Sequence, residues 1–103
     1  MSEFNQFAEE LRIFFAARDW GQFHAPKNLA MSLVSESAEL MQHFRWCSEE
    51  ASRHLSPEVR QEVEDELGDV LINVVALATE LNIDLLQAAR KKLAEIGERF
   101  PTS

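Results

Sequence analysis

Two pairs of acidic residues are the groups in this sequence best suited to chemistry. Glu36 and Glu39 form the first pair, and Glu66 and Asp69 form the second, each with i, i+3 spacing. Residues with this spacing lie on one face of a helix, so each pair would project in a single direction. Carboxylate oxygens are the ligands that Mg²⁺ and Mn²⁺ favour. If the two pairs meet, they would form a site for a hard divalent cation.

The apolar residues around each pair indicate how the pairs could meet. Successive residues of a helix are rotated by about 100°. On this basis, Glu36 and Glu66 each lie at the edge of the apolar stripe of their own helix. The second acid of each pair, Glu39 or Asp69, lies farther from the stripe on the same side. Two such helices, packed antiparallel through their stripes, would bring the carboxylates together. Repulsion and desolvation would make that cluster costly without a cation. Acids with this spacing are also common on solvated helix faces, so the pattern alone leaves both interpretations open. His43 shares the face of the first pair and is expected to be solvated or paired with an acid.

Four helices are predicted to position these acids in one all-α domain spanning residues 1–103. Apolar residues recur at helical spacing over about 3–17, 28–46, 57–81 and 85–97. Ser56 and Pro57 mark the third start, because serine caps a helix and proline suits its first position. Asn82 is expected to end this helix, and Asp84 to cap the next. The connections are short, so neighbouring helices are expected to be antiparallel.

Composition narrows the classes of partner. The net charge of −8 argues against binding to polymeric nucleic acid, which needs a basic surface. A single nucleotide remains compatible if metal ions stand between the two sets of negative charge. No apolar run is long enough to cross a membrane, and the first residues lack a signal-peptide pattern. Cys47 is the single cysteine, so no internal disulfide is expected, and the simplest location is cytoplasmic.

The acid pairs also resemble a known signature. The segments ESAE at 36–39 and ELGD at 66–69 resemble the E-x-x-E…E-x-x-D motif of the MazG-like all-α nucleoside triphosphate pyrophosphatases. The segments 18–29 and 92–101 are similar to the corresponding parts of the dCTP pyrophosphatase branch of that family. The resemblance covers about residues 3–101. It implies a four-helix MazG-like protomer with antiparallel helices, assembled into an oligomeric bundle.

The resemblance further implies a reaction and a metal. The expected activity is Mg²⁺-dependent hydrolysis of nucleoside triphosphates, dCTP or related deoxynucleotides, to monophosphate and pyrophosphate, a role in cleaning the nucleotide pool. Glu36, Glu39, Glu66 and Asp69 match the family's metal-binding acids, with Mn²⁺ as a substitute metal. Either Glu36 or Glu39 would accept a proton from the attacking water, and the sequence does not choose between them.

The resemblance also points to residues that hold the nucleotide. Lys92 and Arg99 match cations at the phosphates, where charge-assisted hydrogen bonds form. The positions that match the surroundings of the nucleotide are Trp20, His24, Trp46 and Asn73. Asn73 stands where relatives often carry Tyr, and Leu11 where they can carry His. Ile96 and Phe100 replace Asn and Tyr in the tail motif, so the preferred base stays open.

Assembly is predicted from the third helix. Residues 70–78 are apolar almost all round the helix, apart from Asn73. A helix of this kind needs partners on several sides, and three other short helices can barely cover it. A homo-oligomer is therefore expected. By resemblance it would be a tetramer built from two dimers, or a dimer, with nucleotide sites at the subunit interface.

Two other function classes are alternatives to the pyrophosphatase. A non-catalytic acidic helical adaptor would present the acids as a solvated face and would bind no metal. A di-iron carboxylate bundle would need Glu-x-x-His motifs on paired helices. No histidine in the sequence follows a glutamate with that spacing, which argues against the di-iron class.

Overall fold

Side-chain caps set where four of the helices begin. The side chains of Ser2, Ser48, Ser56 and Asp84 each accept a hydrogen bond from a backbone N–H three residues later. In this computed structural model, which describes residues 2–102, the caps open α1 (Glu3–Ala17), α3 (Glu49–Ser52), α4 (Pro57–Glu80) and α5 (Leu85–Arg99). The other elements are the 3₁₀ helix η1 (Trp20–Phe23) and α2 (Pro26–Gln42). The all-α class predicted from the sequence is confirmed.

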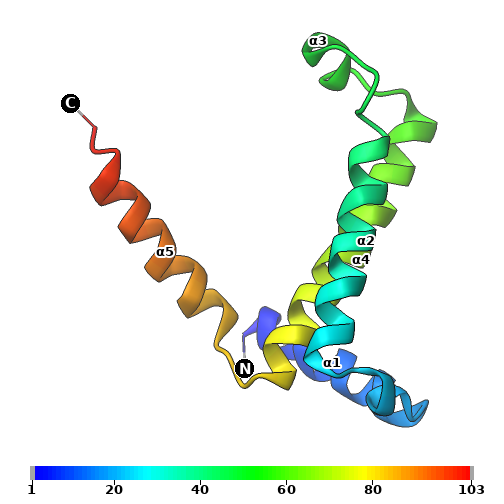
Figure 1. Cartoon of the computed structure of the whole chain (residues 1–103), viewed down its shortest axis with the longest axis vertical. Coiled ribbons are helices and arrows are strands. Elements are labelled where there is room, and N and C mark those ends of the chain that lie inside the picture. The colour runs from blue at the N-terminus through cyan, green and yellow to red at the C-terminus, as the bar shows by residue number, and fades with distance from the viewer. Residues whose placement is uncertain (1, 103) are drawn as a thin grey trace.

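The helices α2 and α4 form the centre of the molecule. They lie side by side along most of α2 and run in opposite directions (Figure 1). The helix α1 packs against α4 near the end of α4, and the short α3 lies at the opposite end of the pair (Figure 1). Because α2 and α4 carry the two acid pairs, this antiparallel packing decides whether those pairs meet.

The core lies where α1, α2 and α4 come together. Within residues 2–102, the buried hydrophobic residues are Leu29, Val75, Ala76 and Ala78. Three of these belong to the last third of α4, which is the apolar stretch of the sequence. Small alanine side chains in α4 let a neighbouring helix approach closely.

A left-handed residue ends α4 and turns the chain away. Asn82 has φ 54°, the Asn82 N–H donates to the Thr79 carbonyl, and the Ile83 N–H donates to the Ala78 carbonyl. This pair of bonds is the Schellman arrangement that closes many helices. The predicted helix end at Asn82 is therefore confirmed. Beyond it, α5 extends away from the α2–α4 pair (Figure 1).

The single chain is extended rather than compact. Its radius of gyration is 16.6 Å, compared with about 13 Å for a typical domain of 100 residues. No residue of α5 is buried. The open shape leaves apolar side chains of α5 without cover from the rest of the described chain.

The boundaries of three predicted segments were wrong. The second helix begins at Pro26 and ends at Gln42, instead of spanning 28–46. Proline suits the first helical position, while after Gln42 the N–H groups of His43 and Phe44 donate to carbonyls three residues back, which is a turn rather than a continued α-helix. The structure also forms η1 and α3 where only loops were expected. The Ser48 cap, followed by Glu49 and Glu50, supplies the signal for α3.

No helix within residues 2–102 combines the length and the apolar composition needed to cross a membrane.

Candidate metal centre

Three carboxylates from the two central helices converge. Glu36 and Glu39 on α2 and Glu66 on α4 each place an oxygen within 4.8 Å of the others. Opposite oxygens around Mg²⁺ are about 4.2 Å apart. The three side chains therefore need only a small adjustment to hold such an ion. Asp69 is exposed on α4 and does not belong to this group of three, although its charge acts on Glu36.

Two oxygens of this cluster are buried without a partner. Glu36 Oε2 and Glu66 Oε2 are shielded from solvent and accept no hydrogen bond from any described residue. Buried carboxylate oxygens are normally hydrogen-bonded or bound to a metal, because desolvation is otherwise uncompensated. The all-oxygen donor set suits Mg²⁺ or Mn²⁺. These residues therefore fit the cation that the sequence pattern predicted.

The electrostatics of the cluster favour a bound cation or proton. Burial, the close approach of the Glu66 carboxyl group and the charges of Glu39, Asp69 and Glu66 together raise the pKa of Glu36 to about 7. The ordinary pKa of this group is 4.5. A carboxyl group held in this way carries its negative charge at a cost, and a divalent cation removes that cost.

A histidine–carboxylate contact lies one turn from the cluster. His43, the residue that follows the last residue of α2, places Nδ1 3.4 Å from Oε2 of Glu62 on α4. The sequence predicted that His43 would be either solvated or paired with an acid, and the structure shows the pairing. The sequence alone did not identify the partner, because the contact depends on the register between the two helices.

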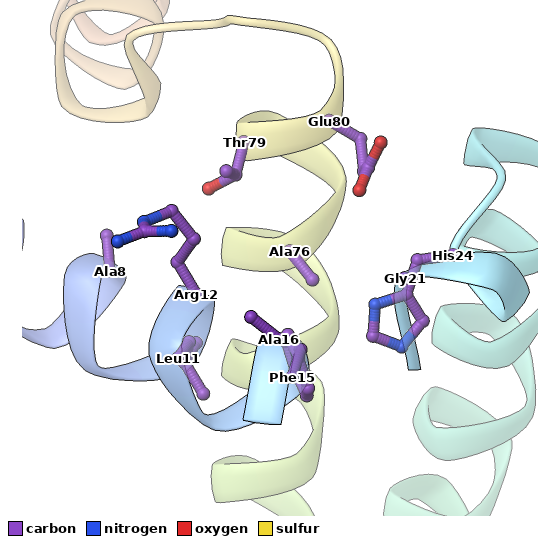
Figure 2. Close-up of a pocket in the computed structure, with 10 residues that line it drawn as sticks. All are labelled: Ala8, Leu11, Arg12, Phe15, Ala16, Gly21, His24, Ala76, Thr79 and Glu80. Carbon is purple, nitrogen blue, oxygen red and sulfur yellow. The ribbon is translucent and has the colours of Figure 1, made fainter. Parts of the chain in front are cut away.

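A pocket lies farther along the same face of α4. It has a volume of about 190 Å³ and lies between α1, the turn around η1 and the end of α4 (Figure 2). Its apolar wall includes Leu11, Phe15 and Ala76, and Glu80 lies at the opposite side from Leu11 (Figure 2). Ala76 follows Asp69 by seven residues, which places both on one face of the helix.

Two of the predicted nucleotide-binding residues lie at or beside this pocket. His24 lines it, and its ring meets the Phe15 ring edge-on at 4.5 Å between centroids. The Trp20 ring lies 6.2 Å from the Phe15 ring, just beyond the lining residues. Asn73 lies between the acids and the pocket, and its side chain donates to the Asp69 carbonyl at 2.9 Å. The pocket itself was not predicted, because it forms between segments far apart in the sequence.

None of the other three predicted substrate residues is part of the pocket or the carboxylate cluster of its own chain. Trp46 is 87% exposed beyond the end of α2, with the Arg45 guanidinium 4.9 Å from the centre of its ring. Lys92 and Arg99 belong to α5, which stands apart from α2 and α4 (Figure 1). Lys92 pairs with Glu95 on the same helix, at 3.3 Å. One chain alone therefore does not bring these cations to the carboxylate cluster.

Comparison with known proteins gives the relatives of this chain. A sequence model of the MazG-like family matches residues 31–102. Over 90 residues, or 85% of the chain, it is 43% identical to dCTP pyrophosphatase 1 of Mus musculus and 42% identical to that of Homo sapiens. The match covers 53% of each relative, so the chain spans about half the length of these curated relatives.

A solved structure extends the similarity to nearly the whole fold. A pyrophosphatase from Archaeoglobus fulgidus DSM 4304 superposes with a TM-score of 0.92 and 31% identity, over 99% of this chain and 95% of that one. The family match covers more than half of the residues, and it includes the helices α2 and α4 from residue 31 onward, where the carboxylate cluster lies. The chain therefore belongs to the MazG-like family.

Proposed function

We propose that this chain is a metal-dependent nucleoside triphosphate pyrophosphatase. The observation that carries the proposal is the cluster of Glu36, Glu39 and Glu66, with two buried oxygens that lack partners. Its membership of the MazG-like family, and its similarity to proteins named dCTP pyrophosphatase, support the same reaction. The proposed substrates are dCTP or related deoxynucleoside triphosphates, and the products are the monophosphate and pyrophosphate.

The carboxylates have two tasks in this reaction. Glu36, Glu39 and Glu66 would hold Mg²⁺, or Mn²⁺ in its place, with Asp69 close enough to contribute its charge. The bound ion supplies neutralisation of the triphosphate and acidification of the attacking water. Glu36 or Glu39 accepts the proton of that water. The variants Glu36→Gln and Glu39→Gln can be compared in metal affinity and in turnover. Replacing the general base should reduce turnover more than it reduces metal affinity, and this pattern identifies the base.

The pocket beside α4 provides a place for the base of the nucleotide. From Glu66 to Ala76 the helix advances about 15 Å, at 1.5 Å per residue. A nucleotide with its phosphates at the carboxylates would extend along this face toward Leu11, Phe15 and His24. The apolar wall excludes water from one side of the base, and aromatic edges favour a flat ring.

Assembly is part of the proposal. Lys92 and Arg99 are separated from the acids of their own chain, and the rest of α5 leaves apolar side chains exposed. A second copy would cover those side chains and bring the cations of α5 to its neighbour's phosphates. We therefore propose a homo-oligomer, either a dimer or a tetramer built from two dimers, with each site completed by a neighbouring subunit.

The test identifies the products as well as the rate. Purified protein is incubated with each deoxynucleoside triphosphate and Mg²⁺, and the products are separated by ion exchange. Release of pyrophosphate and monophosphate, abolished by EDTA and by Glu39→Ala, is the expected result. Release of single phosphate would contradict the proposal. An absence of both hydrolysis and Mg²⁺ binding would favour the acidic adaptor instead.

A further inference from the structure

The seam between α2 and α4 has two polar meeting points with opposite effects. At the first, Glu36 and Glu39 of α2 face Glu66 of α4, and their like charges push the two helices apart when the three groups are ionised. At the second, Nδ1 of His43 lies 3.4 Å from Oε2 of Glu62. This polar contact connects the two helices at the end of α2.

The helical register places the two meeting points next to each other. His43 follows Glu39 by four residues on α2, and Glu62 precedes Glu66 by four residues on α4. Because the helices are antiparallel, both steps lead about one turn in the same direction along the seam. The contact therefore lies beside the cluster, on the side where α2 ends and the chain turns away.

No other ion pair among residues 2–102 joins two helices. The remaining pairs connect residues three or four positions apart, such as Arg12 with Glu9 and Arg60 with Glu64. Pairs of that kind stabilise one helix and do not hold a second. The His43 side chain is 21% exposed, while that of Glu62 is 61% exposed. His43 is thus mostly enclosed at the seam, where its position is restricted.

We propose that His43 and Glu62 are positioning residues for the metal centre. Their contact holds the last turn of α2 against α4, so that the carboxylates of Glu36 and Glu39 stay within reach of Glu66 before a cation arrives. Preorganisation of this kind lowers the cost of metal binding, because the ligands need not be drawn together against their own repulsion. The inference rests on the proposed metal-dependent function.

The direction in which His43→Leu changes Mg²⁺ affinity separates this positioning role from a simple charge effect. If His43 were only a neighbouring group with partial positive charge, His43→Leu would leave Mg²⁺ affinity unchanged or make it tighter. If His43 positions the helices, the same substitution weakens Mg²⁺ binding. The expected loss is about tenfold, the lower end of the effect of removing outer-shell partners at metal sites. Isothermal titration of the full chain with Mg²⁺ measures it, with circular dichroism to verify the helices.

Further variants test whether the two residues act as a pair. Glu62→Ala should weaken Mg²⁺ binding, and the double variant with His43→Leu should lose little more, because one contact is removed in each case. Glu64→Ala is the matched control: it removes one negative charge from α4, but its partner Arg60 lies on the same helix. His43→Asn keeps an amide donor near the position of Nδ1 and should restore most of the affinity.

The possible outcomes distinguish this inference from the proposed function. Wild-type Mg²⁺ binding with no loss in His43→Leu would overturn the positioning role and leave the pyrophosphatase intact. Equal losses in Glu62→Ala and Glu64→Ala would also overturn it, in favour of net charge. Nitrogen hyperfine coupling in the electron paramagnetic resonance spectrum of bound Mn²⁺ would overturn the positioning role too, because it would show His43 to be a metal ligand. A wild-type chain that binds neither ion would overturn both proposals.

Discussion

At the scale of single residues, the site depends on Glu36, whose carboxyl group is partly buried but must be charged for the proposed activity. Its carboxyl group lies at the seam of α2 and α4, with one oxygen buried and unpartnered. Burial and the neighbouring acids raise its pKa from 4.5 to about 7. Below about pH 7 the folded chain without metal therefore favours the protonated form, whereas the proposed activity needs the charged form. A cation bound at the cluster would stabilise the charged form of Glu36 in the folded protein.

This conflict predicts a dependence of stability on pH. Since the pKa of Glu36 is raised on folding, the folded state binds more protons than the unfolded state between pH 4.5 and about 7. The free energy of unfolding of the metal-free protein should therefore fall as the pH rises through that range. Urea denaturation at a series of pH values, in EDTA, measures the slope. Glu36→Gln should flatten it, while Glu98→Gln on α5 should not.

At the scale of elements, α4 matters more than any other helix. It carries Glu62, Glu66 and Asp69, it supplies most of the buried residues, and it contacts both α1 and α2. Its start depends on Ser56, whose Oγ accepts a hydrogen bond from the Val59 N–H at 3.2 Å. A local cap thus supports the position of the whole site.

The caps of α4 and α3 should differ in their effect on stability. Ser56→Ala removes the cap of the central helix and is expected to cost about 1 kcal/mol of unfolding free energy. Ser48→Ala removes a cap of the same kind from α3, which has no buried residue, so its effect should be clearly smaller. Chemical denaturation of both variants, in the presence of Mg²⁺, gives the comparison. Equal losses of unfolding free energy in the two variants would show that a cap on the central helix α4 stabilises the protein no more than a cap on α3.

At the scale of the whole molecule, the single chain leaves an apolar face of α5 exposed. The exposed apolar residues of α5 and the residue after it recur along one side of the helix: Leu86, Leu93, Ile96 and Phe100. Among the described residues, no other helix covers them. A stripe of this kind is stabilised by burial against another surface. Because the chain carries a net charge of −8, a second copy would also attract the basic residues of α5.

One substitution on this stripe should weaken assembly. Leu93 is 69% exposed in the single chain, and Leu93→Ser would remove its contribution to the interface. Lys91→Ser makes the same small polar residue on the opposite side of α5 and is the matched control. Sedimentation velocity over a range of concentrations should show dissociation for the first variant only. A wild-type protein that is monomeric at every concentration would contradict the proposed oligomer.

Mixed subunits can show whether α5 completes a neighbouring site. Lys92→Ala and Glu39→Ala should each be nearly inactive alone, because one lacks a phosphate cation and the other lacks a metal ligand. If Lys92 acts on the site of another copy, a mixture that has exchanged subunits should regain activity. If Lys92 acts within its own chain, the mixture should stay inactive. Pyrophosphate release before and after exchange is the measurement.

The sequence by itself determined the local features of this protein. Ser56 and Asp84 mark helix starts, and Asn82 marks a helix end, because capping involves only residues a few positions apart. The spacing of Glu36 with Glu39, and of Glu66 with Asp69, places each pair on one face for the same reason. Apolar periodicity was enough to predict an all-α chain, but it missed the short helices η1 and α3 and misplaced both ends of α2.

Tertiary structure decided everything that depends on how the helices pack. It placed Glu36, Glu39 and Glu66 together but left Asp69 at the edge, it paired His43 with Glu62, and it formed the pocket between α1 and α4. It also directed α5 away, so that Lys92 and Arg99 lie far from the acids of their own chain. These outcomes depend on helix register and crossing geometry, which arise from contacts between residues distant in the sequence. The local pattern indicated only that the two acid pairs could meet.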